Sequence, residues 1–191
     1  MAVKVVTMRM IVHRLPSSYI LGVRPAVQWR FMPLVLVRRA NTHDEDFLVH
    51  GNSAMAMETE HRALDVIRLR QGVRGLFENP VRGVYYIAEI DGEPAGHMLI
   101  TNEWSDWRNG DFWWIQSVFV VPRLRGQGVF RALYAHIEKL ARADEGVCSL
   151  RLSVENANTA AQATYRRCGM QRADYQMFET DFVLGRPELT A

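Results

Sequence analysis

The residues most able to do chemistry in this chain lie between an apolar run and an amphipathic stretch. The apolar run 113–121 is followed closely by Arg123-x-x-Gly126-x-Gly128. Glycines let a backbone approach a ligand closely, and the first amides of a helix have no intrahelical partner. These amides and the helix dipole favour an anion, and Arg123 and Arg125 add positive charge. The pattern therefore predicts a binding site for a phosphorylated cofactor.

A second group of informative residues lies further along the chain. It has the pattern Asn158-x-x-Ala161-x-x-x-Tyr165 and is followed by Gly169. Residues three or four positions apart on a helix are neighbours, so Asn158, Ala161 and Tyr165 would share one face. Asn158 would also cap the start of this helix, and Gly169 is typical of a residue that ends one.

Together, the two patterns resemble the motifs of the GNAT superfamily of acyl-CoA-dependent N-acetyltransferases. The resemblance spans residues 34–182. It implies a single α/β domain with one mixed, mostly antiparallel sheet flanked by helices. It also implies that acetyl-CoA is the co-substrate and that a primary amine, on a small molecule or a peptide, attacks the thioester directly. No covalent enzyme intermediate would form.

The resemblance also assigns roles to individual residues. The amides around the glycines would bind the diphosphate of acetyl-CoA, and the end of the preceding strand would pair with the pantetheine arm. An amide near Val118 could stabilise the oxyanion. Tyr165 would protonate the leaving thiolate, because a phenol with an ordinary pKa of about 10 is protonated at neutral pH. The residues implied in cofactor binding are Val118, Phe119, Val120, Arg123, Arg125, Gly126, Gln127, Gly128, Val129, Phe130 and Asn158.

The general base is harder to identify. In relatives that use a strand carboxylate it would fall within 113–117, where this chain has only Trp, Ile, Gln and Ser. Gln116 and Ser117 cannot act as bases, although either could hold a water. Glu103 is the first choice as base, and the alternatives left open are Asp106, Asp111, Glu58, Glu60 and His61. The missing carboxylate also leaves open a catalytically inactive module of the same fold that binds acyl-CoA as a sensor or partner domain.

The elements that must position these residues follow the order β-α-α-β-β-β-α-β-α-β. The expected strands cover 34–39, 83–90, 94–101, 112–121, 148–154 and 171–182, and the expected helices cover 42–57, 59–77, 129–143 and 158–168. Thr59 would cap the second helix, and Gly51-Asn52-Ser53 could interrupt the first. A polar loop is expected at 103–111, where Trp104 and Trp107 could cradle a cationic amine. Trp113 and Trp114 must face opposite sides of their strand.

Length and composition bound the remaining possibilities. The chain has 191 residues, 48% of them apolar, which suits one domain with a substantial core. We assign this domain to 33–185, between a basic N-terminal extension, 1–32, and a C-terminal tail, 186–191. The extension resembles a transit peptide or a translated upstream region; we expect it to be disordered and to carry no chemistry.

Charge and cysteine content exclude several other classes of protein. Residues 44–191 hold 16 Lys and Arg against 21 Asp and Glu, a balance of −5 that argues against a nucleic-acid-binding surface. No apolar stretch approaches the ~20 residues that a membrane span needs. Two cysteines imply no disulfide framework, so we expect a cytoplasmic protein. His97 and His136 have no companions at metal-ligand spacing, so no metal is expected. A homodimer remains open.

Overall fold

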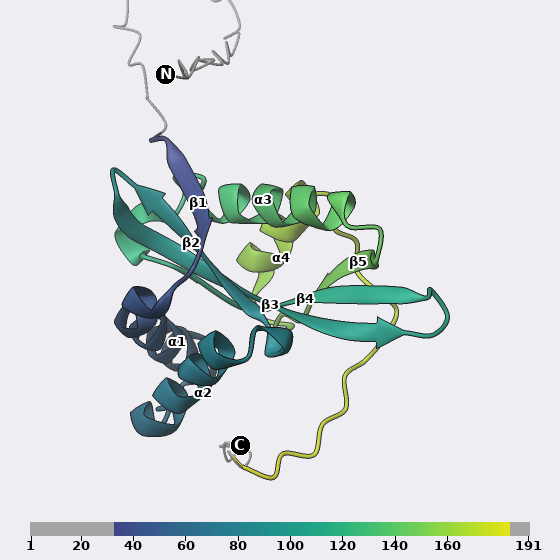
Figure 1. Ribbon diagram of the computed structural model, residues 1–191, viewed down its shortest axis with the longest axis horizontal. Helices are drawn as coiled ribbons and strands as arrows, with labels where there is room; N and C mark the ends of the chain where they lie inside the picture. Colours follow the sequence, from purple (N-terminus) through teal and green to yellow (C-terminus); the bar gives the residue numbers. More distant parts are fainter. Residues whose placement is uncertain (1–32, 184–191) are drawn as a thin grey trace, which may run out of the picture. The chain divides into compact units, whose positions relative to one another are not determined.

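The structure is a computed structural model, and it describes residues 33–183. Its sheet has five strands in the spatial order β1-β2-β3-β4-β5, so each strand lies beside its neighbour in the sequence (Figure 1). The first three pairings are antiparallel, and the pairing of β4 with β5 is parallel. This arrangement confirms the mixed, mostly antiparallel sheet flanked by helices. The expected extension 1–32 and tail 186–191 lie outside the described residues.

The described chain forms strands, α-helices and short 3₁₀ turns that alternate along the sequence. The strands are β1 (Val35–Arg39), β2 (Val84–Ile90), β3 (Glu93–Ser105), β4 (Gly110–Val120) and β5 (Val147–Leu152). The α-helices are α1 (Glu45–Glu60), α2 (Val66–Glu78), α3 (Val129–Ala143) and α4 (Thr159–Arg167). The short 3₁₀ turns are η1 (Thr42–Asp44), η2 (Pro80–Arg82) and η3 (Pro122–Leu124). None of the helices in this part of the chain is long and apolar enough to cross a membrane.

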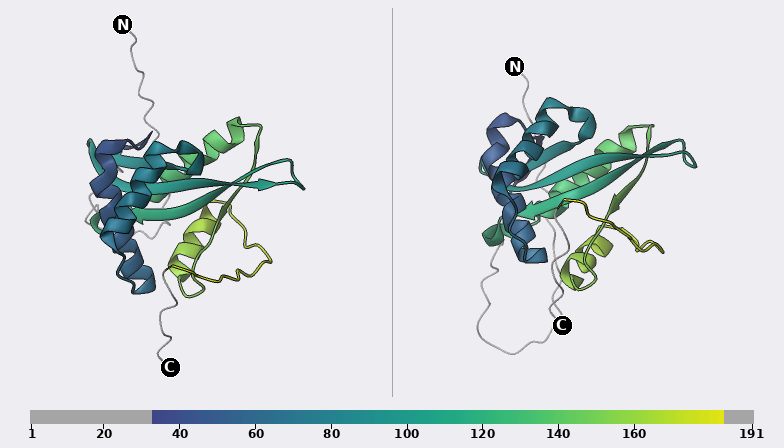
Figure 2. Two further views of the ribbon diagram at one scale, coloured as in Figure 1. Left: turned by 60° about the horizontal axis from the view of Figure 1, so that its bottom comes forward. Right: turned by 90° about the horizontal axis from the view of Figure 1, so that it is seen from below.

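Helices cover both faces of the sheet (Figures 1 and 2). α1 and α2 lie against one face, where Leu48 and Val73 belong to a buried apolar cluster. α3 lies against the other face, and its side chains Leu133 and Ile137 are completely buried in a second cluster with Met98 of β3. The apolar residues of α3 recur at the spacing of an amphipathic helix, which confirms the prediction of a buried stripe.

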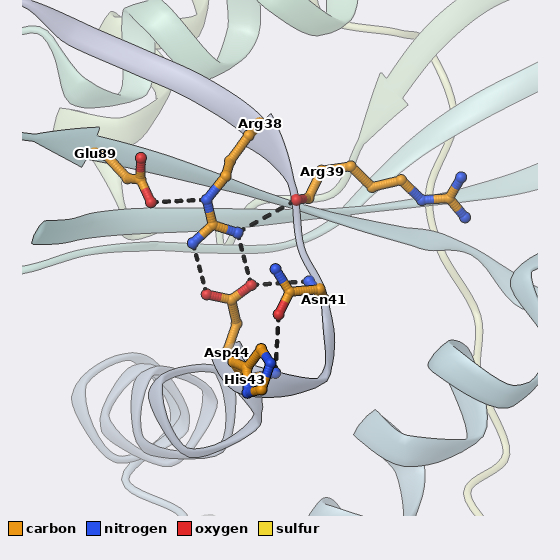
Figure 3. Close-up of polar contacts among 6 residues, drawn as sticks. All are labelled: Arg38, Arg39, Asn41, His43, Asp44 and Glu89. Carbon is orange, nitrogen blue, oxygen red and sulfur yellow. Dashed lines mark hydrogen bonds and ion pairs between the residues drawn. The ribbon is translucent and has the colours of Figure 1, made fainter. Parts of the chain in front are cut away.

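An ion-pair network fixes the passage from β1 into α1 (Figure 3). Arg38 donates to the two carboxylate oxygens of Asp44 at 2.7 and 2.8 Å, and to Glu89 at 2.7 Å. The Asn41 amide also donates to Asp44, at 2.8 Å. Burial alone would raise the pKa of Asp44, but the hydrogen bonds from Arg38 and Asn41 outweigh it and lower the pKa. The network anchors the start of α1 to the edge of the sheet.

The boundary between the first two helices differs from the prediction. α1 runs without interruption through 51–53, and it includes Thr59, whose hydroxyl donates to the Met55 carbonyl at 3.0 Å. Asp65 caps α2, with its side chain accepting from the amides of Ile67 and Arg68. The prediction of Thr59 as the cap is therefore wrong. Both residue types favour helix starts, and only the tertiary structure shows which one is used.

The expected polar loop at 103–111 is a β-hairpin instead. β3 and β4 remain paired until Ser105 lies opposite Gly110. Trp104 and Trp107 lie near the tip of this hairpin, with 61% and 88% of their surface exposed. The prediction of a loop is wrong because polar residues can also form strands where no helix covers the sheet. The hairpin projects beyond the helical layers (Figure 1).

The segment after α4 does not form the expected strand. Residues 171–182 have no regular secondary structure, and all of them are exposed. The large apolar side chains among them are Tyr175, Met177, Phe178 and Phe182. The strand prediction for 171–182 is therefore wrong, and β5 is left as the edge strand of the described sheet.

Candidate functional site

The centre of the predicted site is the second half of β4. On one side, β4 pairs with β3 as far as Val120. The register of this pairing shifts by one residue: Leu99 lies opposite Ser117, but the next residue of β3, Ile100, lies opposite Ile115. Gln116 is therefore the extra residue of a β-bulge, a feature often found beside active sites. On the other side, the pairing with β5 ends where Ile115 meets Leu152.

In the described sheet, residues 116–120 therefore have no strand beside them on the side of β5, and we call this stretch the free edge of β4. The Val121 amide donates to the Ala95 carbonyl of β3 at 2.9 Å. Because hydrogen-bonding directions alternate along a strand, the amides and carbonyls of Val118 and Val120 point to the other side. This free edge of β4 can pair with an extended ligand that carries amide groups. It is where the sequence predicts the pantetheine arm and the oxyanion-stabilising amide near Val118.

The free edge leads into the glycine turn and the start of α3. Gly126 and Gly128 have φ angles of +74° and +89°, which glycine adopts without the strain of a side chain. A Cβ atom on Gly126 would meet no other atom within 4 Å, so the turn is open on that side. Gly128 occupies the N-cap of α3, and among residues 33–183 no side chain caps this helix. The first amides from Val129 onward are thus available to an anion.

The two arginines of the turn have different environments. Arg123 is exposed, and within the described chain its guanidinium makes no ion pair; its carbonyl accepts from Gln127 at 3.0 Å. Arg125 instead forms a bidentate ion pair with Glu58 of α1, with N–O distances of 2.6 and 2.7 Å. The Arg125 Nε also donates to the Val120 carbonyl at 3.1 Å. Only Arg123 is therefore ready to meet an anion without rearrangement.

α4 carries the residues of the second predicted pattern, with Asn158 at its N-cap and Tyr165 about two turns further along. The Asn158 side chain caps the helix by accepting from the Ala161 amide at 3.0 Å, as predicted. The Tyr165 ring lies 5.4 Å from that of Phe130, which follows the glycine turn in α3. Burial raises the pKa of Tyr165, which keeps the phenol protonated at neutral pH. Phe130 thus links the start of α3 to the predicted proton donor.

Glu103, the first choice as general base, is not brought together with Tyr165. It lies on β3 opposite Phe112, before the free edge begins. Its carboxylate accepts a hydrogen bond from Trp114 Nε1, and Arg151 lies 3.3 Å away. The alternation of β3 and β4 side chains places this group on the face opposite the α3 core. Glu103 therefore already has two donors and no contact with the predicted acid.

Three of the other candidate acids have partners for their side chains, whereas Asp111 bonds only through its backbone, with its amide donating to the Gly146 carbonyl, among the described residues. Arg125 lowers the pKa of Glu58 through the ion pair. Glu60 lies 4.0 Å from Arg62. Asp106 accepts from the Trp107 amide in the hairpin turn, at 2.9 Å. No sequence pattern indicates the pair of Glu58 and Arg125, whose members are 67 positions apart in the chain.

A buried histidine lies on β3, beside the half of β4 that carries the free edge. His97 of β3 is opposite Phe119 of β4 and is completely buried, in ring contacts with Phe47, Tyr85 and Phe119. Neither ring nitrogen has a hydrogen-bond partner in the described part of the protein. Burial lowers the pKa of His97 to about 3, so the ring is neutral. A Cβ atom on Gly51 would lie 2.5 Å from its Nε2, so α1 packs closely here.

Comparisons with known proteins agree with this arrangement. Residues 53–170 match the model of a family described as "Acetyltransferase (GNAT) family". A thialysine N-epsilon-acetyltransferase of Caenorhabditis elegans is 32% identical over 109 residues, which cover 56% of this chain and 66% of that relative. The chain thus spans slightly less than two thirds of that curated relative.

Solved structures extend the likeness over more of the chain. The crystal structure of a possible acetyltransferase from Clostridium difficile 630 is similar with a TM-score of 0.73 and 37% identity, covering 78% of this chain and 99% of that one. A predicted acetyltransferase from Clostridium acetobutylicum, solved with acetyl-CoA, is similar in fold with a TM-score of 0.63 and 16% identity, covering 77% and 96%. The chain belongs to the GNAT acetyltransferase family.

Proposed function

We propose that this protein transfers an acetyl group from acetyl-CoA to a primary amine. The proposal rests mainly on one observation: the free edge of β4, the open glycine turn and the start of α3 follow one another along the chain. These features suit the pantetheine arm and the diphosphate of one CoA molecule. The binding of acetyl-CoA by a structural neighbour supports the choice of donor.

The donor is proposed to bind along β4 and across the turn. The diphosphate accepts hydrogen bonds from the amides that begin α3, and Arg123 adds positive charge. The pantetheine amides pair with the Val118 and Val120 backbone as a short added strand would. Asn158 uses its side-chain oxygen to cap α4, so its NH₂ group is the part that can donate to the cofactor arm.

The proposed chemistry is direct transfer. The neutral amine attacks the thioester carbonyl, and the oxyanion of the tetrahedral intermediate accepts from the Val118 amide. The carbon–sulfur bond then breaks, and Tyr165 gives its proton to the departing thiolate. The proton lost by the amine nitrogen reprotonates the phenolate through solvent. The products are the acetylated amine and CoA with a free thiol.

The relative from Caenorhabditis elegans suggests which acceptors to test first. Its name identifies the Nε amine of thialysine as the acceptor of that protein. We propose an amino acid with a side-chain amine as the first acceptor class, followed by peptides and aminoglycosides. The test is release of CoA thiol from acetyl-CoA in the presence of each amine. No release with any amine, in protein that binds CoA, would contradict a catalytic role.

An alternative is a module that binds acyl-CoA without catalysis. Two observations support it: the stretch 113–117 has no carboxylate, and Glu103 is already bonded to Trp114 and Arg151. This alternative expects CoA binding with no turnover, and it expects no functional consequence from replacing Tyr165. The thiol-release assay separates the two functions directly.

The C-terminal segment supports a proposal about assembly. We propose that two copies of the chain associate through 171–183 and the edge of β5. The apolar side chains of this segment are exposed, and β5 has a strand on one side only in the described sheet. An edge strand is a template for strand addition. Light scattering coupled to gel filtration tests the proposal, and a monomer at all concentrations would contradict it.

A further inference from the structure

The guanidinium group of Arg125 donates hydrogen bonds to two different partners, a carboxylate and a backbone carbonyl. Its two terminal nitrogens donate to the carboxylate of Glu58 in a bidentate ion pair. Its Nε donates to the carbonyl of Val120, which points to the free edge of β4. Arg125 therefore occupies an acceptor on the edge where the pantetheine arm is proposed to bind.

Glu58, which binds the Arg125 guanidinium, is not part of the proposed cofactor site. It comes from the last turn of α1, whereas Arg125 directly precedes Gly126 of the turn. Both side chains are partly exposed, by 43% for Arg125 and 51% for Glu58. Exposed ion pairs contribute little stability, because solvent screens them and the side chains lose entropy. A ligand with stronger negative charge can therefore displace the carboxylate.

A diphosphate is such a ligand. Guanidinium groups bind phosphate oxygens with the same two-pronged geometry that Arg125 uses for Glu58. The first amides of α3, from Val129 onward, would attract the diphosphate to the end of the glycine turn that Arg125 begins. A guanidinium that turns toward the diphosphate would also leave the Val120 carbonyl free to accept from a pantetheine amide.

Building on the proposed function, we propose that Glu58 and acetyl-CoA compete for Arg125. In the free protein Glu58 holds the guanidinium over the free edge of β4. In the donor complex the diphosphate takes the guanidinium, and the Val120 carbonyl passes to the pantetheine arm. Glu58 is thus a positioning residue that weakens donor binding and does not touch the reacting atoms.

The test is the affinity of CoA for the variant Glu58→Gln. Loss of the competing carboxylate should tighten CoA binding by about two- to fivefold, the range that an exposed ion pair allows. Isothermal titration calorimetry measures this dissociation constant. In steady-state kinetics, KM for acetyl-CoA should fall by the same factor, and kcat should stay near the wild-type value.

Two matched variants separate the exchange from a general charge effect. Glu60→Gln removes the same charge two positions away, from a side chain that lies near Arg62; its CoA affinity should match the wild type. In an Arg125→Ala background, Glu58→Gln should no longer change CoA affinity. Thermal melting of all variants checks that the fold is retained.

The outcomes distinguish this inference from the proposed function. CoA binding by the wild type without a gain in Glu58→Gln would overturn the exchange and leave the proposed function intact. An equal gain in Glu60→Gln, or a gain that persists without Arg125, would also overturn it. A wild-type protein that does not bind CoA would refute both.

Discussion

The buried His97 makes the stability of this fold depend on pH in a calculable way. Burial lowers its pKa to about 3 in the folded protein, whereas an unfolded histidine titrates with a pKa of about 6.5. Folding therefore favours the neutral ring. The resulting stability is fully present above pH 6.5 and is lost as the pH falls from 6.5 toward 3. Tyr85, the other titratable ring against His97, stays neutral throughout because burial raises its pKa.

The loss of stability between pH 7 and pH 5 follows from the difference in proton binding between the unfolded and the folded protein. The unfolded chain takes up a proton at this ring over the interval, and the folded protein does not. His97 alone should therefore lower the free energy of unfolding by about 2 kcal/mol. Any folded pKa below about 4 gives the same result, because the ring is then neutral at pH 5. A loss of this size is a large part of the total of about 5–15 kcal/mol typical of folded proteins.

Urea unfolding followed by tryptophan fluorescence at pH 7, 6 and 5 measures the effect. The wild-type midpoint should fall by roughly 1 M urea over this range. In His97→Leu, which fills the site with an apolar side chain, this contribution should disappear. His43→Gln, at an exposed position in η1, is the control and should keep the wild-type dependence. Equal pH dependence in wild type and His97→Leu would refute the reasoning.

Three further predictions concern the candidate site. Tyr165→Phe should lower kcat at least a hundredfold and leave the dissociation constant of acetyl-CoA nearly unchanged; an unchanged rate would remove Tyr165 from the mechanism. Gly128→Glu should abolish CoA binding in calorimetry, because it puts negative charge at the start of α3 and a side chain at a φ of +89°. Normal CoA affinity would show that the turn is not the diphosphate site. Glu103→Gln should retain most activity, since its carboxylate is already bonded; a hundredfold loss of kcat would instead identify Glu103 as the base.

The parts of the fold that local patterns determine could be predicted from the sequence. α3 spans 129–143 as expected, because its apolar residues recur every three or four positions and Gly128 precedes them. The hairpin between β2 and β3 also follows from Asp91-Gly92, both of which have positive φ angles. The start of α2 could not be predicted, because Thr59 and Asp65 are both suitable caps.

The candidate site also has features that local sequence patterns predict and features that only the tertiary structure shows. Both predicted motifs are local patterns, and the structure places Tyr165 beside Phe130 at the end of the glycine turn. The contacts of Glu103 with Arg151, and of Glu58 with Arg125, depend on which strands and helices become neighbours. Spacing along the chain carries no information about such pairs. For this reason the sequence predicts the donor side of the site better than the side that would receive the amine.

The bulge at Gln116 has a consequence for how β4 tolerates change. Trp113 and Ile115 contact the α3 core before the bulge, and Val118 and Val120 contact it after the bulge. The step from 115 to 118 is three residues, so the two halves of the strand are out of phase with each other. Removing one residue here would restore the regular step of two, so the later side chains of β4 would keep their faces and only the bulge would be lost. Position 116 should thus accept many different side chains, and deletion of one residue between Ile115 and Val118 should preserve the core contacts of β4 while removing the bulge beside the free edge.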